Sequence, residues 1–130
     1  MATANLNRFE KSIDGFDSII ITKDVADVPC GVTLDVSEYA EDTIKSGHLL
    51  IQNNTTFVVK PLGITSGGNY SALPSGHSYF GINKTTILKA MPMAAVLRIG
   101  QVNAAAAKEF VGAEYPAAAK TALNKIDFIY

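Results

Sequence analysis

Residues 48–59 read HLLIQNNTTFVV, two runs of strand-forming residues separated by the Asn53-Asn54 pair. Aliphatic, aromatic and β-branched side chains favour extended backbone, and asparagine tolerates the positive φ angles of tight turns. The pattern predicts a β-hairpin in which residues His48–Gln52 pair with residues Thr55–Val59 across a two-residue turn. This hairpin is the clearest local feature of the chain, and His48 is expected at its strand edge.

Further strands are expected on both sides of the hairpin. Upstream, Ser18–Thr22 is a β-branched run, and Val32, Leu34 and Val36 alternate with polar residues at the period of a half-buried strand. The intervening Asp24–Gly31 is expected to form a loop. Downstream, a long loop rich in Gly, Ser, Asn and Pro precedes more strand-forming runs: the loop is Pro61–His77, and the runs are Tyr79–Ile82, Thr85–Leu88, Ala94–Ile99, which ends at Gly100, and Ile126–Tyr130.

Two short helices are expected where the composition shifts, because twelve of the seventeen alanines fall between Ala90 and Ala122. Asn103 is a suitable N-cap for a helix over Ala104–Val111, with Gly112 as its stop. A second helix is expected over Pro116–Leu123, since proline fits the first helical position. The predicted fold is therefore mainly β with short helices (α+β): an N-terminal arm and first strand over residues 1–21, and a compact single β-rich domain over residues 22–130.

The composition argues against several classes of function. With 130 residues, 48% of them hydrophobic and 18% charged, the chain fits one globular domain with a core of its own. A formal net charge of −1 without a basic patch argues against nucleic acid as a partner. The most apolar stretch, Met91–Ile99, is too short to span a membrane, and no signal peptide is visible. Cys30 is the only cysteine, so no disulfide framework is expected.

The charges are unevenly distributed along the chain. Residues 1–42 carry nine acidic and three basic side chains, a net charge of −6, whereas residues 43–130 carry eight basic and three acidic ones, a net charge of +5. This asymmetry has two interpretations. Either it is chance on solvated faces, or an acidic N-terminal part meets a basic body, its own or a neighbour's.

The residues that usually carry catalysis or hold metals do not form a recognisable set. Ser75 and His77 lie two apart in a loop, without the surroundings of an activated serine. His48, His77 and Cys30 match no zinc-ligand spacing, and the segment Gly63–Gly68 lacks the lysine of a phosphate-binding loop. The acids Glu38, Glu41 and Asp42 fit a solvated turn. The chain is therefore not expected to be an enzyme, or to hold a metal or other cofactor.

Several segments, taken in order, resemble the small head decoration proteins of tailed phages. They are the Gly-led hairpin strand Gly47–Ile51, the segment Tyr79–Ile82, the segment Gly100–Asn103 after a small-residue strand, and the closing Ile126–Ile129 that follows an Ala-rich stretch. The resemblance covers roughly residues 30–130 and rests on short motifs. The chain departs from the pattern in length, because Pro29–Asp42 and Pro61–His77 are longer than a minimal decoration domain requires. This departure leaves open a head-fibre base or another auxiliary capsid protein.

The resemblance implies a homotrimer on the outside of the virion, made in the host cytoplasm, that clamps neighbouring major capsid protein subunits. It also implies an N-terminal arm that reaches the capsid protein, and its candidate contacts are Phe9, Ile13, Phe16, Ile19, Ile20 and Ile21. For the run 19–21, a buried strand and an exposed, adhesive edge both remain open. Arg98 is expected either to point outward from its strand or to contact a neighbouring subunit.

Two other classes of function remain as alternatives. A small-ligand or carbohydrate-binding β-domain would use Tyr70, Tyr79 and Phe80 beside the long loop. An enzyme built on Ser75 and His77 is the remaining one.

Overall fold

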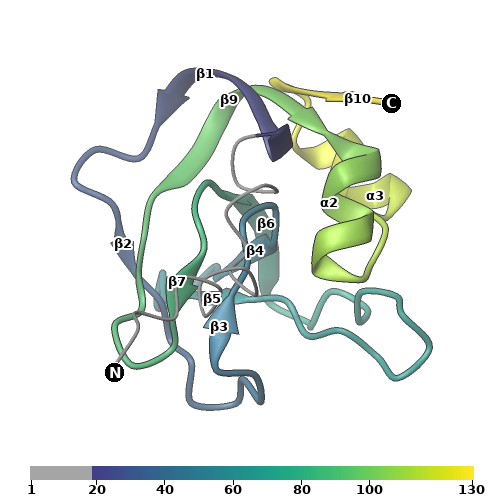
Figure 1. The fold of residues 1–130 in the computed structure, drawn as a ribbon. Helices are drawn as coiled ribbons and strands as arrows, with labels where there is room; N and C mark the ends of the chain where they lie inside the picture. The colour runs from purple at the N-terminus through teal and green to yellow at the C-terminus, as the bar shows by residue number, and fades with distance from the viewer. Residues whose placement is uncertain (1–18) are drawn as a thin grey trace, which may run out of the picture.

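Strand β9, Val96–Asn103, is the strand around which the main sheet is built (Figure 1). The structure is a computed structural model, and it describes residues 19–130. Six strands form this sheet in the order β1-β9-β6-β4-β5, with β10 also paired to β9, and two pairs of short strands, β2-β8 and β3-β7, lie outside it. The elements are β1 Ile21–Asp27, β2 Val32–Thr33, β3 Thr43–Ile44, β4 Leu49–Asn53, β5 Val59–Pro61, β6 His77–Asn83, β7 Ile87–Leu88, β8 Met93–Ala94, α2 Ala104–Val111, α3 Ala117–Ala122 and β10 Ile126–Ile129. The predicted class, mainly β with short helices in a compact single domain, is confirmed.

One edge of β9 is shared between two strands. Its first residues pair antiparallel with β6, and its last residues, Gly100–Asn103, pair with β10, which runs parallel to it. Along the opposite edge, β1 pairs antiparallel with β9, and three register shifts interrupt this pairing. Strand β9 therefore joins the N-terminal strand, the central hairpin and the C-terminal strand.

Both faces of the sheet are covered, which explains three consecutive buried residues in β4. Leu49 and Ile51 point into a core shared with helix residues such as Phe110, while Leu50 points into a second cluster with Leu34 and others. All three β4 side chains are fully buried. Alternate residues of a strand face opposite sides, so a continuous apolar run is expected only where both sides are packed.

The hairpin forms, but its register differs from the prediction. Ile51 pairs with Lys60 and Gln52 with Val59, so the turn contains four residues between Asn53 and Val58 rather than two. The side chain of Asn53 stabilises this longer turn, because its Oδ1 accepts hydrogen bonds from the backbone N–H groups of Thr55 (2.8 Å) and Thr56 (3.0 Å). Phe57 then takes a positive φ of 62° and closes the loop. The asparagine acts through its side chain and not through its own backbone angle.

Other strand bounds also differ from the prediction, for example those of β1 and β9. The first strand begins at Ile21 and continues to Asp27, through residues assigned to a loop, because an edge strand needs only backbone pairing and can carry polar side chains. The domain boundary at residues 21/22 therefore cuts through a strand of the main sheet. Strand β9 does not end at Gly100 but continues to Asn103, with β10 as partner.

The helix prediction is confirmed at both ends of α2. The Oδ1 atom of Asn103 accepts a hydrogen bond from the N–H of Ala106 at 3.0 Å, and Gly112 follows the helix with a φ of +90°. Helix α3 also forms, with Pro116 just before its first residue rather than as that residue. The two helices pack on the sheet face that contains Leu49 and Ile51, and they supply Ala107, Phe110 and Ala119 to that core.

Candidate functional site

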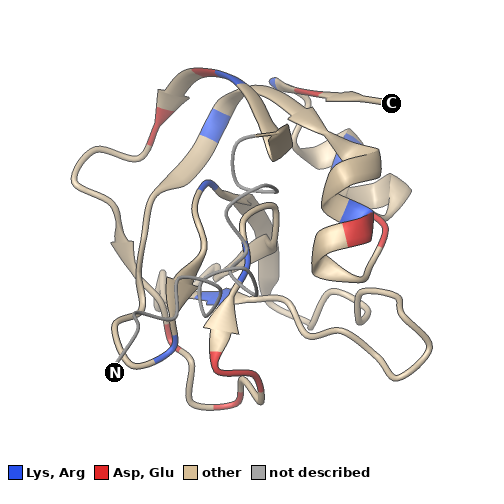
Figure 2. Cartoon of the chain, in the orientation of Figure 1, with Lys and Arg blue, Asp and Glu red and all other residues tan. Residues whose placement is uncertain are grey.

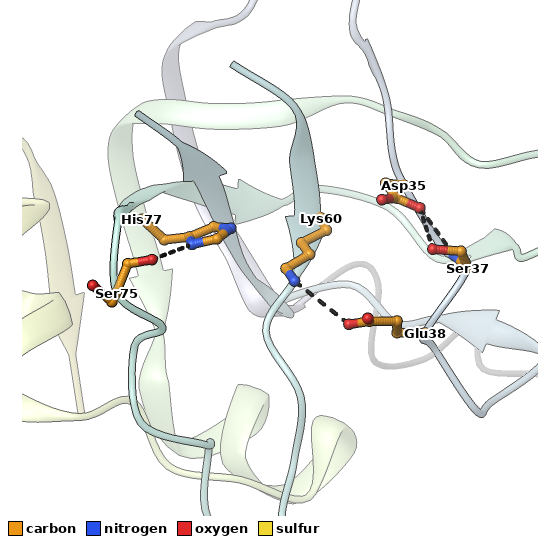
Figure 3. A network of polar contacts seen from close by, with 6 residues as sticks. All are labelled: Asp35, Ser37, Glu38, Lys60, Ser75 and His77. Carbon is orange, nitrogen blue, oxygen red and sulfur yellow. Dashed lines mark hydrogen bonds and ion pairs between the residues drawn. The ribbon is translucent and has the colours of Figure 1, made fainter. Parts of the chain in front are cut away.

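The Ser75–His77 pair lacks the geometry of a nucleophile and its base. The Nδ1 atom of His77 lies 3.2 Å from the main-chain carbonyl oxygen of Ser75, not from its hydroxyl (Figure 3). The contact is local and solvent-exposed, so it orders the loop before β6. In this arrangement the Nδ1 atom is directed to the serine carbonyl rather than to the serine hydroxyl, from which a general base would take a proton.

His48 was expected at a strand edge, but it is buried in the core, with 1% of its surface exposed. Its Nε2 lies 2.7 Å from the carbonyl oxygen of Leu62, and its ring stands edge-on between the rings of Tyr39 and Tyr70. Burial lowers the pKa of the imidazole to about 4, with Lys45 adding to the effect against the raising influence of the Leu62 carbonyl. The side chain is therefore neutral near pH 7, and its role is structural.

Residues 19–130 contain no group of three His, Cys, Asp or Glu side chains placed to hold a metal ion. Cys30 is exposed on the turn before β2, whereas His48 is buried, so two of the three residues considered for zinc lie in different environments. In the same range no helix has the length and apolar character needed to cross a membrane.

The acidic side chains that follow Ile21 are partly neutralised by basic side chains of the same chain. Lys84 forms ion pairs with both Asp24 and Asp27 of β1. Its Nζ atom lies 2.7 Å from Oδ2 of Asp27. These contacts raise the pKa of Lys84 and lower that of Asp27. At this point acidic side chains of β1 do meet a basic side chain of the same chain, as the second of the two interpretations of the charge asymmetry would have it.

A second such contact links the loop after β2 to the hairpin. Glu38 lies 3.6 Å from the ammonium group of Lys60, and Figure 3 shows this pair beside the contact between Asp35 and Ser37. Hydrogen bonds from Ser37 lower the pKa of the Asp35 carboxyl group. Asp35 and Glu38 thus hold the loop through these contacts, and Glu41 and Asp42 are exposed in the same loop.

A cleft of about 500 Å³ lies between this loop and the long loop after β5. Its lining includes Tyr39, Glu41, Lys45, Thr65 and Ser66, together with His48. The hydroxyl of Tyr39 and the ammonium of Lys45 are both occupied, since they donate to the carbonyl oxygens of Thr43 and Phe110. The cleft has the size of a small-ligand site, and its lining contains both polar and apolar side chains.

The aromatic site considered for a carbohydrate does not form. Tyr70 is 9% exposed, and its hydroxyl accepts a hydrogen bond from the backbone N–H of Leu49 at 3.1 Å. The ring of Phe80 is covered by the guanidinium group of Arg98, whose carbon lies 4.7 Å from the ring centre. Tyr79 is half-buried against the main core. The three rings therefore have separate structural surroundings.

Arg98 points outward from β9 and also donates a hydrogen bond to the carbonyl oxygen of Phe80 at 2.6 Å. The outward orientation is the first of the two expectations for this residue. A contact with a neighbouring subunit stays a prediction.

The candidate capsid contacts fall into two groups. Phe9, Ile13 and Phe16 lie outside the described residues. Of the run 19–21, Ile19 is 46% exposed, Ile21 is half-buried and Ile20 is completely buried in the main core. Ile20 therefore cannot contact a partner in this conformation, because its side chain packs among core residues.

The sequence reading missed a group of exposed apolar side chains in the connection from β7 to β8. Leu88, Met91 and Met93 are 57%, 69% and 65% exposed. Leu88 ends the run predicted as a strand over Thr85–Leu88, whereas Met91 and Met93 lie in the most apolar stretch, Met91–Ile99, before the predicted strand Ala94–Ile99. Pro92 was the available signal, because proline disfavours the interior of a sheet and often marks a turn.

Comparison with known proteins adds no relative to this description. The chain matches no protein-family model, and neither a curated protein nor a solved structure is significantly similar to it.

Proposed function

We propose that this protein is a structural protein of a phage virion, which binds the outside of the capsid shell and stabilises it by bridging major capsid protein subunits. The proposal includes a homotrimeric assembly and an N-terminal arm that contacts the capsid. It excludes catalysis, a cofactor and contacts with nucleic acid or membrane.

The observation that carries the proposal concerns where the resembling segments lie. Three of them, Gly47–Ile51, Tyr79–Ile82 and Gly100–Asn103, belong to or adjoin β4, β6 and β9, which are neighbours in one sheet. A Cβ atom at Gly81 would lie 2.6 Å from Val96 Cγ1 and 2.7 Å from the carbonyl oxygen of Leu97. The motif glycine thus lies where two strands approach too closely for any side chain. The resemblance therefore involves positions that determine this fold, which supports more than a chance likeness of short motifs.

The contacts of the polar side chains also support a structural role for the protein. His48, Arg98, Lys84 and Lys60 all make structural contacts with their own chain. A shell-stabilising protein needs surface contacts that are repeated over many copies. Each contact can be weak, because multivalency makes the combined binding of many contacts strong.

Binding to shells tests the proposal directly. The purified chain is mixed with empty shells assembled from the major capsid protein of the same viral genome, and bound protein is measured by sedimentation. We expect saturable binding, a higher melting temperature of the shell, and a trimer by size-exclusion chromatography with light scattering. A monomer that neither sediments with shells nor occurs in purified virions would contradict the proposal.

Deletion of residues 2–12 tests the arm. We expect weaker attachment to shells while the melting temperature of the isolated protein stays unchanged. Loss of folding in this variant would show that the deleted residues belong to the core and not to an arm.

A ligand-binding module, such as a head-fibre base, is the second candidate, and the cleft beside Tyr39 favours it. A glycan array probed with the wild-type chain and with Glu41→Gln tests this function. Glycan binding that the substitution removes would favour it over shell attachment.

A further inference from the structure

The connection between β7 and β8 presents its apolar side chains on a fixed support. We call residues Leu88–Met93 the apolar turn. The turn begins with Leu88, the last residue of β7, which pairs with Thr43 of β3. It ends with Met93, the first residue of β8, which pairs with Thr33 of β2. Within the turn, the N–H of Met91 donates to the carbonyl oxygen of Leu88 at 3.0 Å, and the N–H of Met93 donates to that of Met91 at 2.8 Å. The backbone is thus held from both sides while the side chains of Leu88, Met91 and Met93 remain exposed.

An acidic loop is attached to this turn. We use this name for residues 35–42, which carry Asp35, Glu38, Glu41 and Asp42. The N–H of Lys89 donates to the carbonyl oxygen of Asp42 at 2.8 Å, and the Lys89 ammonium group donates to the carbonyl oxygen of Tyr39. Figure 2 shows acidic positions of the loop before β3 at the same end of the molecule as the apolar turn. The two elements therefore form one surface.

The charge of this surface is not balanced from within the described part of the chain. Glu41 and Asp42 are exposed and form no ion pair with another residue of 19–130, whereas Asp24 and Asp27 are paired with Lys84. The Lys89 ammonium group is directed to a backbone oxygen. An apolar centre with an acidic margin is complementary to an apolar groove with basic side chains at its margin.

We propose that the apolar turn and the acidic loop together form the surface that docks into a basic-margined apolar groove on the capsid shell. This inference rests on the proposed function. Methionine side chains suit such a contact, because they are flexible and fit irregular apolar surfaces. A two-fold contact between copies through this surface is a poorer fit, since it would bring two acidic loops together, and a contact within the proposed trimer is distinguished by the self-association measurement below.

Three variants and a matched control test the docking surface by the same shell-sedimentation measurement. Leu88→Ser/Met91→Ser/Met93→Ser removes the apolar centre, and we expect it to raise the Kd for shells at least about tenfold, as for residues central to an interface. Glu41→Gln/Asp42→Asn removes the unpaired charge, and we expect the salt dependence of binding to become weaker. Tyr130→Ser is the control, because Tyr130 is 89% exposed and follows β10 at the opposite end of the molecule (Figure 1). Met91→Ser/Met93→Ser tests the same surface should Leu88→Ser disturb β7.

The outcomes separate this inference from the proposed function. Wild-type protein that fails to sediment with shells overturns both. Wild-type and triple-variant proteins that bind shells equally well, with equal melting temperatures, overturn the docking surface alone. A triple variant that loses self-association but keeps shell binding also overturns it, and assigns the surface to a second copy. Loss of shell binding in the folded triple variant, with Tyr130→Ser unaffected, supports it.

Discussion

Lowering the pH from 7 to about 4 is expected to reduce the free energy of unfolding by about 3 kcal/mol through His48 alone. The imidazole is buried between the rings of Tyr39 and Tyr70, and its pKa in the folded protein is about 4, against an ordinary value of 6.5. One unit of pKa difference between the folded and unfolded states corresponds to about 1.4 kcal/mol, which gives the stated total.

The direction follows from which state binds the proton. Between pH 6.5 and 4 the unfolded chain protonates this histidine while the folded protein keeps it neutral. Acid therefore stabilises the unfolded state, and stability that is fully present above pH 6.5 is lost as the pH falls toward 4. The slope approaches about 1.4 kcal/mol per pH unit in the middle of this window.

Urea unfolding followed by far-UV circular dichroism at several pH values between 7.5 and 4.5, at one protein concentration, measures this loss. His48→Gln is the control, because its amide can still donate to the carbonyl of Leu62 but does not titrate. We expect the variant to be less stable at neutral pH and to lose most of the pH dependence. A wild-type protein whose free energy of unfolding is constant over this range, or a His48→Gln variant with the same slope, would refute the reasoning.

Three further perturbations test single contacts. Asn103→Ala removes the N-cap of α2 and should reduce stability by about 1 kcal/mol in thermal unfolding, whereas Asn103→Asp, which keeps a capping oxygen, should not. Tyr115→Phe leaves the buried carbonyl of Gly47 without the 2.6 Å hydrogen bond that it accepts, and urea unfolding should show a loss of about 1–3 kcal/mol; a neutral substitution would mean that this carbonyl finds another partner. Lys84→Met removes both ion pairs to β1, so amide hydrogen exchange should become faster in β1 and stay unchanged in β4; equal exchange in β1 would show that pairing with β9 is sufficient to hold it.

The parts of the fold that depend on local chemistry could be predicted from the sequence. Helix α2 was predicted with both ends, because the Asn103 cap and the Gly112 stop act within one helical turn. Strand β10 and the central hairpin were also predicted. The hairpin register was not, because the Asn53 side chain selects a four-residue turn that the sequence pattern does not distinguish from a two-residue one.

Features that depend on contacts between residues far apart in the sequence could not be predicted from the sequence. Strand β1 carries Lys23, Asp24 and Asp27 and has the composition of a loop, yet its pairing with β9 makes it a strand. The burial of His48 depends on Tyr39 and Tyr70 from two different loops. The candidate site was missed for the same reason, since the exposure of an apolar residue depends on what the rest of the chain leaves uncovered.

The central place of β9 has a consequence for how the protein is made. Strand β1 leaves the ribosome before β9, which lies far downstream in the sequence and is the partner of β1 among the strands that the structure describes. Ile21, the first residue of β1, and the strand that follows it must therefore stay unpaired in the nascent polypeptide, at the stage when chains are most prone to aggregate. The charged side chains of Lys23, Asp24 and Asp27 follow directly and can oppose premature association of this segment. Charges that are ion-paired or exposed in the finished sheet thus also oppose aggregation before the sheet exists.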